Sequence, residues 1–217
     1  MIGTALSMLT ILAMLALYKN LVQVAVEATQ DANHDGGLAS ALLTAQLELQ
    51  SAGFGMEKGF EETVFLPDTR PINTILWYYK LPLKNNEQQC AGLIERQHPA
   101  EDKKDFRVLT LLQQSDCSLT LSAPTAANPD AGWETVTNLA VFKKLDPDQP
   151  LLSFTKSNTK CRSPYNLGPD SDPPTHPQII ITAMSSSAIA SGELDNTESN
   201  NLNISYTVCL SNIRSEL

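Results

Sequence analysis

The first 52 residues differ from the rest of the chain in the pattern of their apolar and polar positions. Residues 1–18 read MIGTALSMLTILAMLALY and contain no charged side chain, and the first charge is Lys19. At about 1.5 Å of rise per residue, a helix over this run is about 27 Å long, close to a bilayer core of about 30 Å. The run therefore predicts a helix that can lie in a membrane.

The helical pattern continues beyond the first charge. Residues 19–52 contain no proline. Apolar residues recur there on one face at helical spacing: Leu38, Leu42, Ala45 and Leu49. The pattern predicts one helix over residues 1–52, about 78 Å long. Its first part, 1–18, is apolar, and its second part, 19–52, is amphipathic and packs one face on a globular head.

Residues 33–37, Asn-His-Asp-Gly-Gly, are the weak point of this helix. Each glycine costs about 1 kcal/mol in a helix interior, and Asn and Asp side chains compete for backbone hydrogen bonds. We expect a kink or a short unwound turn there, and the alternative is a helix that runs through. His34 beside Asp35 has the chemistry of a metal or acid–base pair, but we expect an ordinary surface histidine.

The remaining residues, 53–217, alternate between β-rich runs and loops. Residues 53–59 hold three glycines, which predict the end of the helix. Strands are predicted over 72–81, 91–95, 106–112, 117–122, 133–143, 151–156, 178–184 and 202–210. We expect a hairpin from the third and fourth of these strands and pairing between the last two. Loops are predicted over 57–71, 123–132, most of 84–105, and 163–177, which holds five prolines.

These elements predict an α+β fold, in which one protruding amino-terminal helix packs on an antiparallel sheet. The head, residues 53–217, is long enough for one domain with its own core. The formal net charge of −9 argues against a nucleic-acid-binding surface, which needs a concentrated basic patch.

The four cysteines all lie beyond the apolar run. An even number of cysteines outside a membrane segment is typical of disulfides in an oxidising compartment, and the alternative is four buried free thiols. Three pairings are possible. We favour Cys90–Cys117 and Cys161–Cys209, since each joins neighbours in chain order.

No catalytic pattern is found, and we expect no enzymatic activity. The histidines His34, His98 and His176 show no metal-ligand spacing, and neither a nucleophile elbow nor a phosphate-binding glycine loop occurs. Two pairs of carboxylates, Glu61–Glu62 and Glu101–Asp102, are expected to be solvated.

Asp170 and Asp172 are the best candidates for a metal site. Two hard carboxylates on one loop suit calcium, which takes several oxygen ligands at flexible geometry. We nevertheless expect a plain acidic loop and no cofactor. Asn203–Ser205 has the pattern of a glycan acceptor but falls in a predicted strand, so we discount it.

Three interpretations compete for the apolar start of the chain. A cleaved secretory signal has a basic start and a small-residue cleavage site, whereas no Lys or Arg precedes the apolar run here. The second interpretation is a plain membrane anchor that tethers a periplasmic binding module. The third is a helix that serves first as an anchor and later as the core of a filament.

Two segments favour the third interpretation through a family resemblance. Residues 42–55, LLTAQLELQSAGFG, resemble the end of the first helix in PilW-type minor pilins, which closes on Ala-Gly-aromatic-Gly. Residues 178–184, QIIITAM, and 204–212, ISYTVCLSN, are similar to the last strands of that family, which run into an Asn near the end. The resemblance covers the helix and the last strands, roughly a third of the chain.

The resemblance implies a structural subunit of a type IV pilus. The apolar helix would lie in the bacterial inner membrane and then, with the help of pilus assembly machinery, pack against the helices of other pilins in an extracellular filament. The missing basic leader fits a numbering that starts after leader removal. The Cys161–Cys209 disulfide would enclose the carboxyl-terminal region. Relatives in type II secretion, some of which hold calcium, and bulk filament subunits are the alternatives.

The resemblance also assigns the assembly surface to the first turns of the helix: Met1, Thr4, Ala5, Ser7, Leu9, Leu12 and Leu15. One residue departs from the family, because most type IV pilins carry a glutamate at position 5 that neutralises the amino terminus of a neighbouring subunit. Members without that glutamate tend to be tip or initiating subunits. We therefore expect a minor pilin that primes or caps assembly at the tip.

Overall fold

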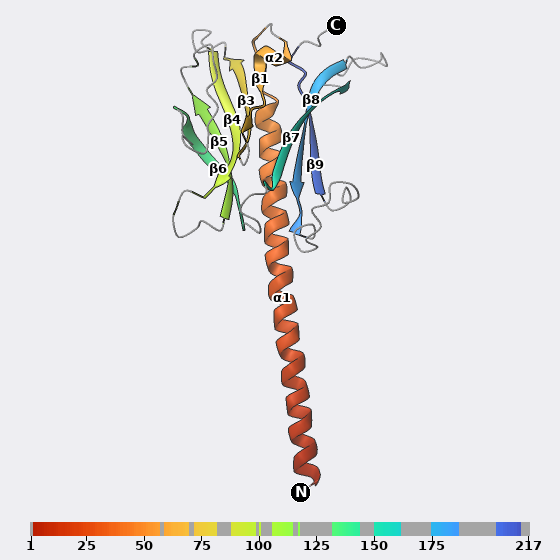
Figure 1. Cartoon of the computed structure of the whole chain (residues 1–217). Helices are drawn as coiled ribbons and strands as arrows, with labels where there is room; N and C mark the ends of the chain where they lie inside the picture. The colour runs from red at the N-terminus through yellow and green to blue at the C-terminus, as the bar shows by residue number, and fades with distance from the viewer. Residues whose placement is uncertain are drawn as a thin grey trace.

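The computed structural model describes residues 2–56, 59–69, 72–81, 88–98, 100, 106–114, 117, 132–143, 150–161, 175–186 and 203–213. Its longest element is α1 (Ile2–Leu49), a helix of 48 residues. At about 1.5 Å per residue this helix is about 72 Å long. One half of α1 projects from the head and the other half lies between two β-sheets (Figure 1). The α+β class predicted from the sequence is confirmed.

Helix α1 is continuous through residues 33–37, so the expected unwound turn does not form there. No atom lies within 4 Å of the position that a Cβ would take on Gly36 or Gly37. Both glycines face open space, so close packing does not explain why glycine occupies these two positions. His34 and Asp35 contact the head within this segment, and the side chain of Leu38, directly after it, is buried. These contacts favour an unbroken helix across the weak point.

A short helix and nine described strands follow α1. They are α2 (Phe60–Thr63), β1 (Val64–Phe65), β2 (Asp68–Thr69), β3 (Ile72–Lys80), β4 (Gln88–Gln97), β5 (Phe106–Gln114), β6 (Glu134–Lys143), β7 (Leu152–Lys160), β8 (Thr175–Met184) and β9 (Asn203–Cys209).

The strands form two antiparallel sheets rather than the single sheet that the sequence predicted. The larger sheet has the order β1-β3-β4-β5-β6, with β2 paired to β3, and the smaller sheet has the order β7-β8-β9. Strand β6 contacts α1 from one side and β9 contacts it from the other.

Several expected boundaries are wrong for a common reason. Strand β4 is ten residues long, twice the predicted run 91–95, because its polar ends pair with β3 and β5. The pairing partners of β5 are β4 and β6, while the predicted partner 117–122 lies outside the described residues except for Cys117. Sheet hydrogen bonding extends a central strand beyond its apolar residues.

Two predicted loops contain regular structure. The run 57–71 holds α2, β1 and β2, which add short edge pairs to β3. Strand β8 begins at Thr175, inside the proline-rich run, and Pro177 pairs with Asn158 of β7. The carbonyl of Pro177 accepts a hydrogen bond from the N–H of Leu210 at 3.0 Å, so the strand tolerates a residue without an N–H donor. The final pairing of β8 with β9 is as predicted.

The main core lies between α1 and the inner faces of both sheets. The apolar positions that the sequence placed on one helix face, Leu38, Leu42, Ala45 and Leu49, are all at most 2% exposed. They pack with buried residues of both sheets: Ile75, Trp77, Leu93, Leu109, Phe142, Ile179, Ile181 and Val208. Burial of this face supplies the apolar contact that holds the two sheets together.

A second apolar cluster lies on the other face of the large sheet. It consists of Met56, Leu76, Tyr78, Cys90, Ile94, Leu112 and Trp133. Because both faces of the sheet are covered, β4 and β5 are buried at successive positions and do not alternate.

The carboxyl end of α1 is fixed by hydrogen bonds from distant parts of the chain. The N–H of Gly53 donates to the carbonyl of Tyr78 at 2.9 Å, and Nδ2 of Asn212 donates to the carbonyl of Gln50 at 2.7 Å. Gly53 adopts a φ of 75°, and a Cβ there would lie 2.6 Å from Cγ1 of Ile213. The Ala-Gly-Phe-Gly sequence thus forms a turn that brings the end of the helix against the last residues of the chain.

Two disulfides join the cysteines in the pairs that the sequence favoured, Cys90–Cys117 and Cys161–Cys209. The second pair connects the residue after β7 to the end of β9, the two edge strands of the small sheet. Each disulfide closes a long loop of the unfolded chain and so restricts the unfolded state.

We predict opposite effects for alanine at two glycines of this helix and its terminal turn. Gly53→Ala should destabilise the head by about 1–2 kcal/mol, because a left-handed backbone is unfavourable with a Cβ. Gly36→Ala, in open space in the helix interior, should stabilise by about 0.5–1 kcal/mol. Urea unfolding of a fragment that begins at Asp31 measures both changes, and equal effects would contradict the assigned role of the turn.

Candidate functional site

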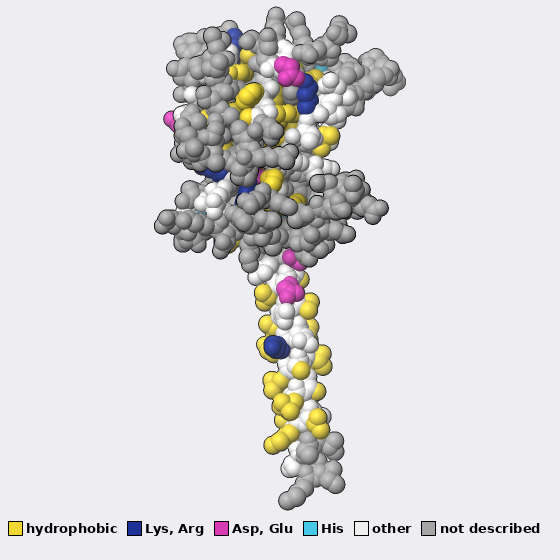
Figure 2. Space-filling view, in the orientation of Figure 1, with side chains coloured by type: hydrophobic (Ala, Val, Ile, Leu, Met, Phe, Trp, Pro, Cys, Tyr) yellow, Lys and Arg dark blue, Asp and Glu magenta, His cyan; other side chains and the backbone are white. Residues whose placement is uncertain are grey.

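The projecting half of α1 is the largest apolar surface that the head does not cover. Every described side chain from Gly3 to Asn33 is exposed. On the face shown in Figure 2, hydrophobic side chains cover much of this part of the helix, with few charges among them. Met8, Leu12 and Leu21 are more than 60% exposed. A helix that is apolar on all sides is stable in lipid or among other helices, and unfavourable in water.

Helix α1 is long and apolar enough to cross a membrane, and its most apolar stretch is not buried in the head. The sequence therefore located the transmembrane candidate correctly. Among the predicted assembly residues, Thr4, Ser7, Leu9, Leu12 and Leu15 lie in α1 with exposed side chains. Met1 and the side chain of Ala5 lie outside the described residues.

Three hydroxyl groups of this half donate hydrogen bonds to the backbone of the helix itself. Oγ of Ser7 donates to the carbonyl of Thr4 at 3.1 Å, and Oγ1 of Thr10 donates to the carbonyl of Ser7 at 2.8 Å. Thr29 makes the same kind of bond to Ala25 at 2.7 Å. A hydroxyl that is satisfied in this way can enter an apolar environment at little cost.

His34 and Asp35 form the junction between the projecting helix and the head. Nε2 of His34 lies 3.3 Å from the carbonyl of Met184, and its ring meets the ring of Phe142 edge-on with centroids 5.4 Å apart. The Asp35 carboxylate accepts hydrogen bonds from the N–H and the hydroxyl of Ser186, both at 2.8 Å. His34 is therefore half-buried between β6 and β8 and is not the surface histidine we expected.

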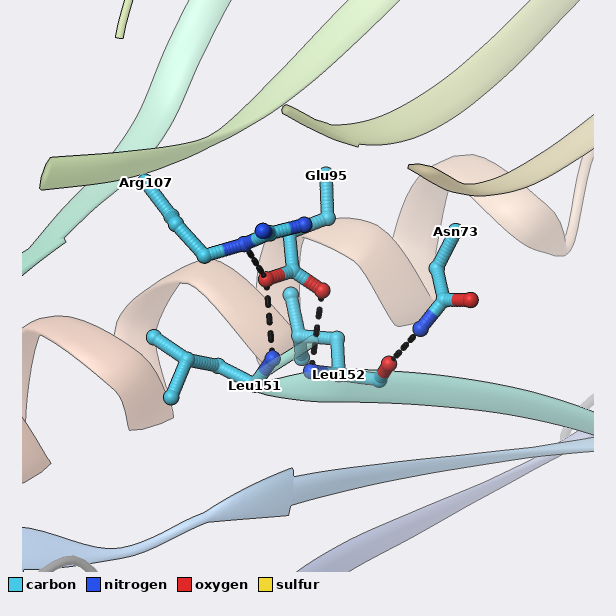
Figure 3. A network of polar contacts seen from close by, with 5 residues as sticks. All are labelled: Asn73, Glu95, Arg107, Leu151 and Leu152. Atoms are coloured by element: carbon cyan, nitrogen blue, oxygen red, sulfur yellow. Dashed lines mark hydrogen bonds and ion pairs between the residues drawn. The ribbon is translucent and has the colours of Figure 1, made fainter. Parts of the chain in front are cut away.

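A buried polar network connects the two sheets (Figure 3). Glu95 of β4 accepts a hydrogen bond from Nε of Arg107 of β5 and from the N–H groups of Leu151 and Leu152, at 2.8 and 3.0 Å. Nδ2 of Asn73 in β3 donates to the carbonyl of Leu152. Three strands of the large sheet thus hold the start of β7 in the small sheet.

The network has the features of a structural contact between the two sheets. Glu95 is 0% and Arg107 3% exposed. Burial raises the pKa of the Glu95 carboxyl above its usual value, while the Arg107 guanidinium and the two backbone N–H donors oppose that shift. All of these donors point at one carboxylate, which fits a fixed structural contact better than proton transfer to a substrate.

The other candidate residues do not come together. His98 Nδ1 accepts a hydrogen bond from the N–H of Ala100 at 3.1 Å, and His176 Nδ1 lies 3.3 Å from the carbonyl of Ile213. Glu61 forms an ion pair with Lys156 at the surface. Among the described residues no group of three His, Cys, Asp or Glu side chains could hold a metal ion.

Two pairs of acidic candidates lie outside the residues that the structure describes. The calcium candidates Asp170 and Asp172 lie outside the described residues, as do Glu101 and Asp102. Asn203, the formal glycan acceptor, lies at the start of β9 and is half-buried.

Comparisons with known proteins add no family: no protein-family model, curated protein or solved structure matches this chain.

We predict that the head folds without the projecting helix. Removal of residues 1–30 leaves the first half-buried residue, His34, and the whole buried face of α1 in place. The fragment should be soluble, monomeric and cooperatively unfolded by urea, whereas the full chain should need detergent or lipid. Light scattering after gel filtration measures the mass of each form. Aggregation of the fragment would refute this two-part architecture.

We also predict that the buried network is essential to stability. Glu95→Ala removes the acceptor shared by Arg107, Leu151 and Leu152, and breaking a buried ion pair typically costs about 3–5 kcal/mol. Glu61→Ala, which removes the exposed ion pair with Lys156, is the matched control and should cost at most about 1 kcal/mol. Urea unfolding of the fragment from Asp31 compares them, and similar losses would show that the network is dispensable.

Proposed function

We propose that this protein is a membrane-anchored filament subunit of the type IV pilin kind. The observation that carries the proposal is the division of α1 into two halves. One half is exposed and begins with an uncharged apolar run, and the other is buried along one face between the sheets of the head. The apolar run, residues 1–18, is about 27 Å long as a helix, which matches a bilayer core before assembly, and it offers a helical surface for bundling afterwards.

The cysteine pairs support the orientation. Both disulfides lie in the head, and disulfides are typical of oxidising compartments, which supports a head on the oxidising side of a membrane. For a bacterial chain of this kind, the proposal locates the helix in the inner membrane and the head in the periplasm, before transfer to an extracellular filament.

Helix bundling is the proposed mechanism. Burial of apolar surface contributes roughly 25 cal/mol per Å², so the contact of several such helices can hold a filament together without covalent links. The hydroxyls of Ser7 and Thr10 in the apolar run donate to backbone carbonyls, so these two groups can enter the bundle at little cost. Separate assembly machinery supplies the energy that extracts the helix from lipid.

The residue at position 5 supports a location at the tip of the filament. Ala5 cannot neutralise the amino terminus of a subunit above it, as a glutamate would. The chain can still offer its own amino terminus to a glutamate of a subunit below. We therefore assign it to the tip as a low-copy minor pilin that primes or caps assembly together with other minor pilins.

Filament incorporation can be tested with the native protein. Intact mass of the purified chain should show an amino terminus processed by prepilin peptidase and methylated. Gold-labelled antibody against the head should mark one end of sheared filaments. The same antibody on filaments from a strain that lacks the chain is the control.

The opposite results identify the alternatives. If the terminus is unmethylated and the chain is found only in washed membranes, the protein is a tethered binding module and not a filament subunit. Labelling along the whole shaft would make the chain a bulk subunit and refute the tip position.

A further inference from the structure

The charges of the projecting helix are few and unevenly placed. Between residues 2 and 33 the sequence has one basic residue, Lys19, followed by two acidic residues, Glu27 and Asp31. All three side chains are exposed. Lys19 and Glu27 are eight residues apart, which is about 12 Å along the helix and about 80° around it. With Gln23 between them, the basic and acidic groups form one stripe along α1, in steps of four residues.

The stripe consists of two pairs of polar residues, and the members of each pair are one helical turn apart. Lys19 and Gln23 form a pair of hydrogen-bond donors, and Glu27 and Asp31 form a pair of acceptors. Nε2 of Gln23 donates to Oε1 of Glu27 within the same helix at 3.0 Å, and a primary amide has a second N–H. The spacing within the donor pair equals the spacing within the acceptor pair.

We propose that these two pairs set the register in which two copies of this chain pack their helices side by side. Two copies that enter a membrane in the same orientation are parallel. At equal depth, facing sides bring like charges together, Lys19 against Lys19 or Glu27 against Glu27, which is unfavourable near lipid. Displacement of one copy by eight residues brings its Lys19 level with Glu27, and its Gln23 level with Asp31, of the other copy.

Only this displacement matches both pairs. A shift of twelve residues brings Lys19 level with Asp31 but places the apolar Leu15 level with Glu27. Towards the amino terminus the stripe continues with exposed apolar side chains, Leu12 and Ala16, which can pack in the same contact. The charges thus keep copies apart at equal depth and favour contact after one has moved about 12 Å outward.

The staggered contact joins the donor pair of one copy to the acceptor pair of the other. Such a contact is heterologous, and it leaves an unused acceptor pair on one copy and an unused donor pair on the other. A closed symmetric dimer does not result, and further copies or other helices with the same pattern can be added. This inference rests on the proposed function for its role as a starting unit of a filament, but the contact itself can be measured without any filament.

Zero-length cross-linking tests the register on the full chain. Copies with natural and with heavy nitrogen are mixed in a mild detergent and treated with a carbodiimide, which joins an amine to a carboxylate in direct contact. The eight-residue separation within one helix is too long for such a link, so every Lys19–Glu27 amide joins two copies. We expect this link, with both nitrogen labels, in the peptide map.

Charge reversal tests the same contact by association. Glu27→Lys should weaken dimer association in detergent about five-fold, the scale of one exposed ion pair, and Lys19→Glu combined with Glu27→Lys should restore it. Glu134→Lys, on the exposed strand β6, makes the same change in net charge and should leave association unchanged.

Three results would overturn the register: a Lys19–Asp31 link in place of Lys19–Glu27, a Lys19–Lys19 link with an amine-reactive reagent, or equal association of Glu27→Lys and Glu134→Lys. Failure of the filament tests with a preserved Lys19–Glu27 link would instead refute the proposed function and leave the helix contact standing.

Discussion

The packing of one half of α1 between two sheets is the contact on which the rest of the structure depends. Leu42, Ala45 and Leu49 are fully buried, and both sheets contribute the residues that bury them. Among the described residues, the two sheets also meet at the junction around Glu95 and the start of β7. One face of α1 thus joins the two sheets, while Leu43 and Leu47 on its opposite face stay exposed and the other half of the helix is left for a different environment.

The sequence predicted those parts of the fold that arise from local patterns. Strands β3, β6 and β9 and the apolar face of α1 could be read from runs of β-branched residues and from helical spacing. The length of β4 and the start of β8 at Thr175 could not, because strand pairing set them, and pairing partners lie far apart in sequence. The split into two sheets has no local signal for the same reason.

In the candidate site, too, local features could be predicted from the sequence and long-range contacts could not. The exposed apolar half of α1 was evident from composition alone. The contacts of His34 and Asp35 with Met184 and Ser186 were not, since they join residues about 150 positions apart. A buried glutamate such as Glu95 looks in sequence like any surface glutamate in a strand. A charged residue in the middle of an apolar run, as in Leu93-Ile94-Glu95, is the one signal that could have indicated it.

The hydrogen bond from Asn212 to Gln50 has a consequence for how the protein is made. It joins residues 162 positions apart, and β9 and Ile213 cover the same end of the helix. During synthesis α1 emerges first and the strands that cover it emerge last. The apolar face around Leu42 therefore stays uncovered until nearly the whole chain has been synthesised, and long-range contacts of this kind form slowly. Anchorage of the first half in the membrane would hold each nascent chain apart from its neighbours during that interval, which limits aggregation through the open face.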